Sequence, residues 1–533
     1  MMEPRQPCRS CGAVLCRNPL PGSSGACRSF LPALASLLGR RCPVALLFLW
    51  AVTTLAGPTN GVVRPLALSD CFRIALEHNF DVSIARYNPE IQRHNLSADY
   101  GVYEPSLGLS GVRSYSETPG GLDAENRPYS GTTTYGDAFN TGLNGLLPTG
   151  LSYNFGGTLN GISGTGPGGS LQSDSAAASV NLIQPLLRNA WIDSARRAIL
   201  VDKKQLKITE LALRQQIMST LTSVELAYFN VILAQEQVNV QEQAFRLAKR
   251  LVDESKSKVK AGSMAPFDEK QAESQLSSSQ ADLLGAQGTL LAQEYALKSL
   301  LSDKFADWDG VRIQPTEKLA VGPQGFDLHE SWRRGLSQRP DFLQVKLRVE
   351  QQGVVLKYLR NQVYPELDLV GSYGQAGSGL TYGTALSGVQ AGTSPSWSFG
   401  AQLTLPLIGN HAARETYRAN KAQLAQQMVQ LKQLEQNIMV QIGVSVEQAK
   451  TRFAQVDATR QSRLFAELAL EAQQRLLDNG RTTSFVVVQL QRDLTTARLN
   501  ELTAMAQYNQ ALAQLALNEG ATLERDKLEL QVK

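Results

Sequence analysis

The sequence has few of the residues that build enzyme or metal sites. Its four histidines are scattered, at His78, His94, His329 and His411. None of them lies in an HExxH motif or in a short cluster with acidic residues. There is no GxSxG, Walker-A or dinucleotide motif, and the glycine-rich stretch 164–169 is not followed by a helix. We therefore expect no catalytic residue, no cofactor and no metal site.

The chain also lacks a net charge once its first 56 residues are set aside. Those residues contain six arginines and one acidic residue, which leaves 46 basic and 47 acidic residues in 57–533. Binding to nucleic acid requires a clustered basic surface. The near-neutral chain therefore predicts no nucleic-acid partner.

Cysteine is nearly absent outside the same leader. Five of the six cysteines lie there, at Cys8, Cys11, Cys16, Cys27 and Cys42. Arg40 and Arg41 precede the apolar segment 44–56, which has the plan of a secretory signal, and we expect cleavage after about Ala56. The CxxC at Cys8 could alternatively bind zinc, but no second CxxC or nearby histidine accompanies it. Only Cys71 would then remain, so an exported chain would be held by packing and oligomerisation rather than by internal disulfides.

Long apolar runs and helix-breaking residues are scarce over much of the remaining chain. No stretch after about residue 57 approaches 18 uninterrupted apolar residues, which argues against a helix that crosses a bilayer there. Residues 190–305 contain three glycines and one proline, and residues 407–519 contain three glycines and no proline. Apolar residues repeat there at intervals of three and four, which predicts long amphipathic helices with a coiled-coil-like seam. We expect these helices at 190–260, 267–302, 410–478 and 484–519.

The remaining segments form an internal repeat. Segments 68–100 and 327–361 each predict two helices with a break, at 79–81 and at 339–341, and each precedes a Gly-rich block. Each block opens with an alternating, strand-like segment and closes with a strand that leads into a proline, Pro185 or Pro406. We expect these prolines to mark strand-to-helix corners and to set the first helical turn. The shorter helical segments would match one long helix in length if they were laid end to end in pairs. We expect the pairs 267–302 with 327–361, and 484–519 with 68–100.

Residues 139–161 have no counterpart in the second half. Two alternating runs flank a Pro-Thr-Gly turn, which predicts an extra hairpin. So few strands cannot close a membrane barrel in one chain, because such barrels need at least about eight. Strands shared among several copies would solve this problem.

Each repeat has the order helix, strand, loop, strand, proline turn and very long helical hairpin. With this order, the chain resembles the TolC-like outer-membrane efflux protein family over about residues 66–520. The resemblance is carried by Leu68 to Asp81, by the Gln-Pro-Leu and Leu-Pro-Leu corners at 184–186 and 405–407, and by the turn segments KAGSMAPFDEKQAESQL and DNGRTTSFVVVQLQRDL. It implies a mainly α fold with a β-barrel part: duplicated long helical hairpins form a trimeric tunnel that joins a shared 12-stranded transmembrane barrel. The extra hairpin departs from this pattern and would either widen the barrel or lie outside it.

By this resemblance the protein would be an outer-membrane duct of an efflux or type I secretion system. It would work as a homotrimer with a periplasmic adaptor protein and an inner-membrane pump. We expect a leader at 1–56, repeats at 57–326 and 327–520, and a tail at 521–533.

The helical turns would form the entrance and the adaptor-docking surface, with residues Gly262, Ser263, Met264, Asp268, Asp478, Gly480 and Arg481. The charged residues at these turns could instead be ordinary solvated helix ends. The alternative for the whole chain is an exported periplasmic coiled-coil scaffold without a pore.

Overall fold

The computed structural model describes residues 63–479 and 481–526, which lie in one compact unit. The predicted leader and signal peptide, with their five cysteines, fall outside these residues, as does Gly480. Cys71, the remaining cysteine, is fully buried.

The helices follow the repeat predicted from the sequence. In the first half they are α1 (Leu68–His78), α2 (Phe80–Tyr100), α3 (Ser194–Lys260) and α4 (Pro266–Leu301). In the second half they are α5 (Leu328–Gln338), α6 (Pro340–Gln362), α8 (His411–Asp478) and α9 (Ser484–Glu519). The break between α1 and α2 is confirmed at Asn79, whose side chain accepts hydrogen bonds from the amides of Asp81 and Val82 and so caps α2. The break between α5 and α6 falls at Arg339, before Pro340 at the first helical position.

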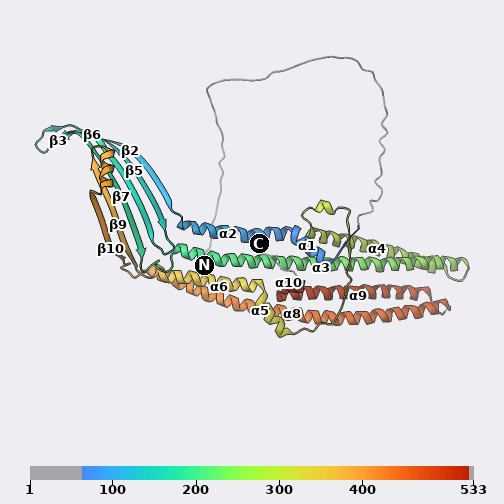
Figure 1. Ribbon diagram of the computed structural model, residues 1–533. Coiled ribbons are helices and arrows are strands. Elements are labelled where there is room, and N and C mark those ends of the chain that lie inside the picture. The colour runs from blue at the N-terminus through green and yellow to red at the C-terminus, as the bar shows by residue number, and fades with distance from the viewer. Residues whose placement is uncertain (1–62, 480, 527–533) are drawn as a thin grey trace, which may run out of the picture. The chain divides into compact units, whose positions relative to one another are not determined.

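The end-to-end stacking predicted for the short helices is wrong. The Asn79 side-chain amide donates to the carbonyl oxygen of Leu300 at 3.0 Å, which joins the α1–α2 break to the end of α4. Arg339 likewise donates to the carbonyl oxygen of Asn518, near the end of α9, at 3.2 Å. In each repeat, the last helix of the long helical hairpin therefore ends beside the two short helices of the same repeat: α4 beside α1 and α2, and α9 beside α5 and α6 (Figure 1). The short helices have similar lengths, so counting residues could not distinguish the two pairings.

The main sheet has six antiparallel strands in the order β10–β9–β7–β6–β5–β2. Their bounds are β2 Ser106–Thr118, β5 Thr132–Leu146, β6 Ser152–Gly166, β7 Gly169–Pro185, β9 Glu366–Gly379 and β10 Ser394–Thr404. The strands continue from the same end of α2, α3, α6 and α8 (Figure 1). The predicted extra hairpin is confirmed as β5 and β6, and it is longer than 139–161. It lies inside the sheet, so each copy has six strands where the family resemblance implies four.

The smaller elements brace the helical part. Strands β1 (Val63–Leu66) and β8 (Arg312–Pro315) pair in parallel beside α3, and the buried Tyr228 hydroxyl of α3 donates to the Leu66 carbonyl oxygen at 3.0 Å. The remaining short elements are η1 (Gly101–Tyr103), β3 (Gly121–Leu122), β4 (Pro128–Tyr129), η2 (Phe305–Trp308), α7 (Tyr382–Ala391) and α10 (Thr522–Arg525).

Helix α3 forms the centre of the largest apolar cluster, which also includes residues of α1, α4 and α9. Part of α3 is long and apolar enough to cross a membrane, but 72% of that window is buried inside the protein. Polar residues interrupt this window, so it contains no uninterrupted apolar run of that length. Its burial is that of a core helix.

The last described segment is fixed to α3 by an ion pair whose acidic partner is buried. Arg525 of α10 contacts the carboxylate of Glu225, which is 5% exposed, and Thr522 of α10 is fully buried. Burial raises the pKa of Glu225 to about 7, although the neighbouring Arg525 opposes that shift.

Candidate functional site

The six-stranded sheet has two chemically different faces. Residues that pair directly across strands lie on the same face, and successive residues along a strand alternate between faces. The strand register therefore sorts the sheet into rows, each of which runs across all six strands on one face.

One such row, which we call the polar row, contains only serine and asparagine. Its members are Ser106, Asn144, Asn154, Asn181, Ser372 and Ser398. Several are linked by hydrogen bonds: Asn181 donates to Asn154 at 3.2 Å, and the Ser372 and Ser398 hydroxyls are 2.7 Å apart. The next row on this face has only glycine and serine: Gly108, Gly142, Gly156, Ser179, Gly374 and Ser396. This polar face carries no charged side chain in these two rows and suits contact with water.

The row between these two, on the opposite face, is entirely hydrophobic or aromatic. This apolar row consists of Leu107, Leu143, Phe155, Val180, Tyr373 and Trp397. Leu107 is 65% exposed and Trp397 is 78% exposed in the single chain. Such an exposed apolar surface needs a cover, which can be a partner or a lipid. A strand with one apolar and one polar side is the pattern of a membrane barrel, with the apolar side toward lipid and the polar side toward the lumen.

A short helix, α7, packs on the apolar face near the end of the sheet far from the long helices. The approach is close: a Cβ atom added to Gly377 would lie 2.1 Å from the Ala385 carbonyl oxygen. Beside α7 is a groove of about 590 Å³ whose walls include Leu109, Phe139 and Leu386. Because the groove includes side chains of the apolar face, it lies away from the polar rows.

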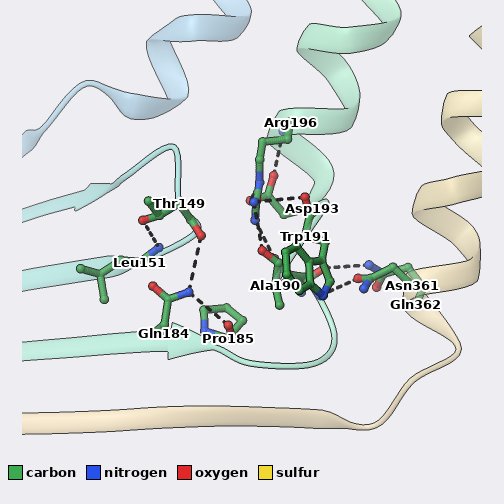
Figure 2. Close-up of polar contacts among 11 residues, drawn as sticks. Thr149, Leu151, Gln184, Pro185, Ala190, Trp191, Asp193, Arg196, Asn361 and Gln362 are labelled. Atoms are coloured by element: carbon green, nitrogen blue, oxygen red, sulfur yellow. Dashed lines mark hydrogen bonds and ion pairs between the residues drawn. The ribbon is translucent and has the colours of Figure 1, made fainter.

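Hydrogen bonds hold the connection from β7 to α3 (Figure 2). Pro185 is the last residue of β7, but α3 begins only at Ser194, where Asp193 accepts a hydrogen bond from the Arg196 amide at 2.7 Å. Arg196 reaches back to the carbonyl oxygens of Ala190 and Trp191 at 3.0 and 3.2 Å. Asp193 and Arg196 thus fix the start of α3.

Pro185 ends β7 and Pro406 lies in the loop after β10, but neither sets the first helical turn. Pro406 follows the end of β10 at Thr404, and α8 begins at His411. The expectation for the first turn is wrong because a short loop separates each strand from its helix. Leu407 and Ile408 in the second loop are 98% and 94% exposed.

The hairpin turns of the two repeats share one capping hydrogen bond. After α3, the amide of Gly262 donates to Val259 at 3.0 Å and that of Ser263 to Lys258 at 2.9 Å, which is a Schellman ending. Gly262 has a φ of +71°, a conformation that glycine adopts at little cost. After α8, the amide of Arg481 donates to Leu476 at 2.9 Å over the same sequence interval.

The two turn regions lie together. The Ser484 hydroxyl donates to the Asp268 carboxylate at 3.4 Å, and Arg492 of α9 contacts Gln275 of α4. A small core cluster joins the same helices to α3, through Leu251, Val252, Ala272 and Val488. Gly262, Ser263 and Arg481 are exposed, whereas Met264 and Asp268 are half-buried. Of the other predicted turn residues, Asp478 is the last residue of α8.

Sequence reasoning missed the asparagines of the polar row and two exposed phenylalanines at the turns. The alternation of asparagine with apolar residues in 139–161 was the signal for the first group. Phe267 is the second residue of α4 and is 74% exposed, and Phe485 is the second residue of α9 and is 56% exposed. Their repeated position is visible only once the helix starts are known.

A two-faced sheet on paired, very long helices is the pattern expected of a class of protein whose strands face lipid and whose helices lie in water. The chain belongs to the outer membrane efflux protein family, whose model matches residues 151–302 and 333–521. It is accordingly an outer-membrane protein with an efflux channel role, as the resemblance implied. This family consists of channels rather than enzymes.

Individual relatives are distant. The chain is similar to the outer membrane efflux protein BepC of Brucella suis, at 22% identity over 60% of this chain and 67% of BepC. It is also similar to the cation efflux system protein CusC of Escherichia coli K12, at 22% identity over 58% of this chain and 66% of CusC. The fold is similar to that of the Campylobacter jejuni CmeC outer membrane channel. That match has a TM-score of 0.62 and 18% identity, and it covers 87% of this chain and 90% of CmeC.

Proposed function

We propose that the protein is the outer-membrane duct of a tripartite efflux or type I secretion system. As a homotrimer, it passively conducts substrates from a periplasmic adaptor and an inner-membrane pump to the exterior. The observation that carries this proposal is the pair of adjacent rows with opposite chemistry. Trp397 and its row suit lipid, whereas Asn154 and its row suit a water-filled lumen.

The same rows support passive conduction. Serine, asparagine and glycine provide neutral hydrogen-bonding groups and no strong charge that would hold an ion in place. Conduction requires binding that is weak enough for the solute to leave. A duct of this kind needs no reactive group of its own, and its driving force comes from the pump.

The helical turns are the proposed periplasmic entrance and adaptor-docking surface. They lie at the ends of α3 and α8 that are distant from the sheet. Gly262, Ser263, Met264 and Asp268 belong to the first turn, and Asp478, Gly480 and Arg481 belong to the second. The exposed Phe267 and Phe485 supply an apolar anchor in each repeat, since aromatic residues often dominate binding at protein interfaces.

The test is complementation of drug or metal efflux in a host that lacks its own duct. A variant without residues 262–264 should reach the outer membrane but fail to restore tolerance, because the docking turn is lost. The matched control removes residues 124–126 from the opposite end, where Asp123 and Arg127 form an exposed pair. Unchanged tolerance in the turn variant would refute the docking role.

The repeats at 57–326 and 327–520 are the proposed units of this duct, each with one helix pair and one long hairpin. The pore-free scaffold predicts a different behaviour on extraction. A heat-modifiable trimer that stays in the outer-membrane fraction supports the duct. Release by high salt would favour the scaffold.

A further inference from the structure

The extra hairpin is an integral part of the sheet. Strand β5 pairs with β2 from Thr132 to Asn144, and β6 pairs with β7 from Ser152 to Gly166. The two strands also pair with each other from Thr133 to Leu146. Every residue of β5 and β6 therefore has a partner within the sheet.

The hairpin also obeys the two-faced pattern of the other strands. It contributes Asn144 and Asn154 to the polar row and Leu143 and Phe155 to the apolar row. Its turn is tied to the neighbouring corner, because the Gln184 side chain of β7 donates to the Thr149 carbonyl oxygen at 3.5 Å (Figure 2). A flap outside a barrel would have no reason to keep this register.

The two outer strands of the sheet each have one unpaired edge. β2 and β10 are the outermost strands, and all of their residues are exposed. In a bilayer, unpaired backbone groups at such an edge cost several kcal/mol each, so membrane sheets close. The six strands alternate in direction, so β10 of one copy can pair antiparallel with β2 of the next and keep the apolar faces continuous.

We propose that the partner of each free edge is a second copy of this chain, and that three copies close one 18-stranded barrel through β2–β10 contacts. This inference rests on the proposed trimeric duct and specifies its width. Closure within a single chain is disfavoured, because six strands fall below the eight of the smallest membrane barrels. The hairpin thus widens the barrel rather than lying outside it.

The width follows from strand geometry. With strands about 4.8 Å apart and tilted about 40°, 12 strands give a backbone diameter of about 24 Å and 18 strands give about 36 Å. Each copy also supplies four helical columns. Two are the long helices α3 and α8, and the other two are α4 stacked on α1 and α2, and α9 stacked on α5 and α6. Twelve columns spaced about 8–10 Å apart form a circle of about 31–38 Å. An 18-stranded barrel is therefore compatible with the width of the helical part.

This width also bears on the class of cargo. The backbone circle would be about 1.5 times as wide as that of a 12-stranded barrel, and the area that it encloses about 2.25 times as large. The polar row and the glycine–serine row add neither bulk nor charge to it. These two rows would thus pass bulky solutes of either charge. Selection by charge would fall to Glu366 and Asp368, which lie on the same face at the helical end of β9.

Cysteine cross-linking in the outer membrane tests the closure. One cysteine replaces Ser106 in β2, and the second is scanned along the polar face of β10 at Ser396, Ser398, Gln402 and Thr404. We expect a disulfide-linked ladder up to the trimer at one position of the scan. The control pair, Ser110→Cys with Asn140→Cys, joins directly paired residues of one chain and should give no ladder. Formation of the control disulfide without a ladder at any position would overturn the proposal.

Electron microscopy of purified trimers measures the width. A variant that lacks residues 132–166 keeps β2 and β7 antiparallel and should form a barrel about two thirds as wide as that of the parent. If this variant does not fold, the diameter of the parent barrel still decides between about 36 and about 24 Å. A conducting parent trimer with the narrow barrel would refute the 18-stranded closure but leave the duct intact. A wide barrel that restores no efflux would refute the proposed function alone.

Discussion

Two neighbouring residues in β5 allow the orientation of the sheet to be tested. Phe139 is at the middle of β5 on the apolar face, and Asn140 follows it on the polar face. We predict that Phe139→Arg prevents stable insertion, whereas Asn140→Arg does not. Arginine near the bilayer midplane costs about 2–4 kcal/mol when it faces lipid, and this cost is small when it faces water.

The magnitude is large enough to measure. A cost of about 2–4 kcal/mol lowers the folded-to-unfolded ratio of each copy by about 30- to 900-fold. The loss of Phe139 contacts adds to this cost, so Phe139→Leu is the control for packing alone. Asn140 makes only a 3.5 Å hydrogen bond to Ser110. Its replacement should therefore leave stability within about 0.5 kcal/mol of the parent.

The assay is refolding into lipid vesicles over a range of urea concentrations, with the heat-modifiable folded band as the readout. Asn140→Arg should also shift the ion selectivity of the pore toward anions, because each copy adds one positive charge to the lumen. Equal destabilisation by the two arginines would refute the assignment of the faces. Greater destabilisation by Asn140→Arg would reverse it.

Three further predictions concern the helical part. Because burial raises the pKa of Glu225 from 4.5 to about 7, the folded state binds its proton more tightly than the unfolded state, and stability should fall as pH rises through that window. Glu225→Gln should remove most of this fall, which is on the order of 3 kcal/mol, and melting of the trimer at pH 4.5 and 7 measures it. Tyr228→Phe removes the tyrosine hydroxyl, while the Leu66 carbonyl oxygen still accepts from the Thr316 amide at 3.1 Å. It should lower the free energy of unfolding by about 1 kcal/mol in chemical denaturation, and no change would refute a stabilising role for the hydroxyl. Asn79→Ala removes both the α2 cap and the bond to Leu300, so it should cost about 1–3 kcal/mol, with Asn79→Asp retaining the cap as the control.

Much of the fold could be predicted from local sequence signals. Residues 190–260 lack proline, and the helix there ends at Lys260 because Gly262, two residues later, readily adopts the left-handed conformation that stops it. The hairpin around Pro148 to Gly150 was visible from alternation on both sides of a turn signal. These features depend on neighbours in the chain, so composition and period suffice to find them.

The candidate site was predicted less completely. The turns around Gly262 were expected, but their contact through Asp268 and Ser484 joins residues from different repeats. Helix lengths led to the expectation that α4 stacks on α5 and α6, but α4 stacks on α1 and α2 of its own repeat. The two pairings have similar lengths. Tertiary hydrogen bonds such as that of Asn79 to Leu300 decide between them.

The sequence by itself determined the two repeats, the long helices, the strand positions and the membership of a known family. It did so because helix period, strand alternation and turn residues are local properties of the chain. Only the tertiary structure decided that the extra hairpin lies between β2 and β7 and that Asn144, Asn154 and Asn181 share one row. Strand order and register depend on pairing between distant segments, and a shift of one residue would place each of these asparagines on the opposite face.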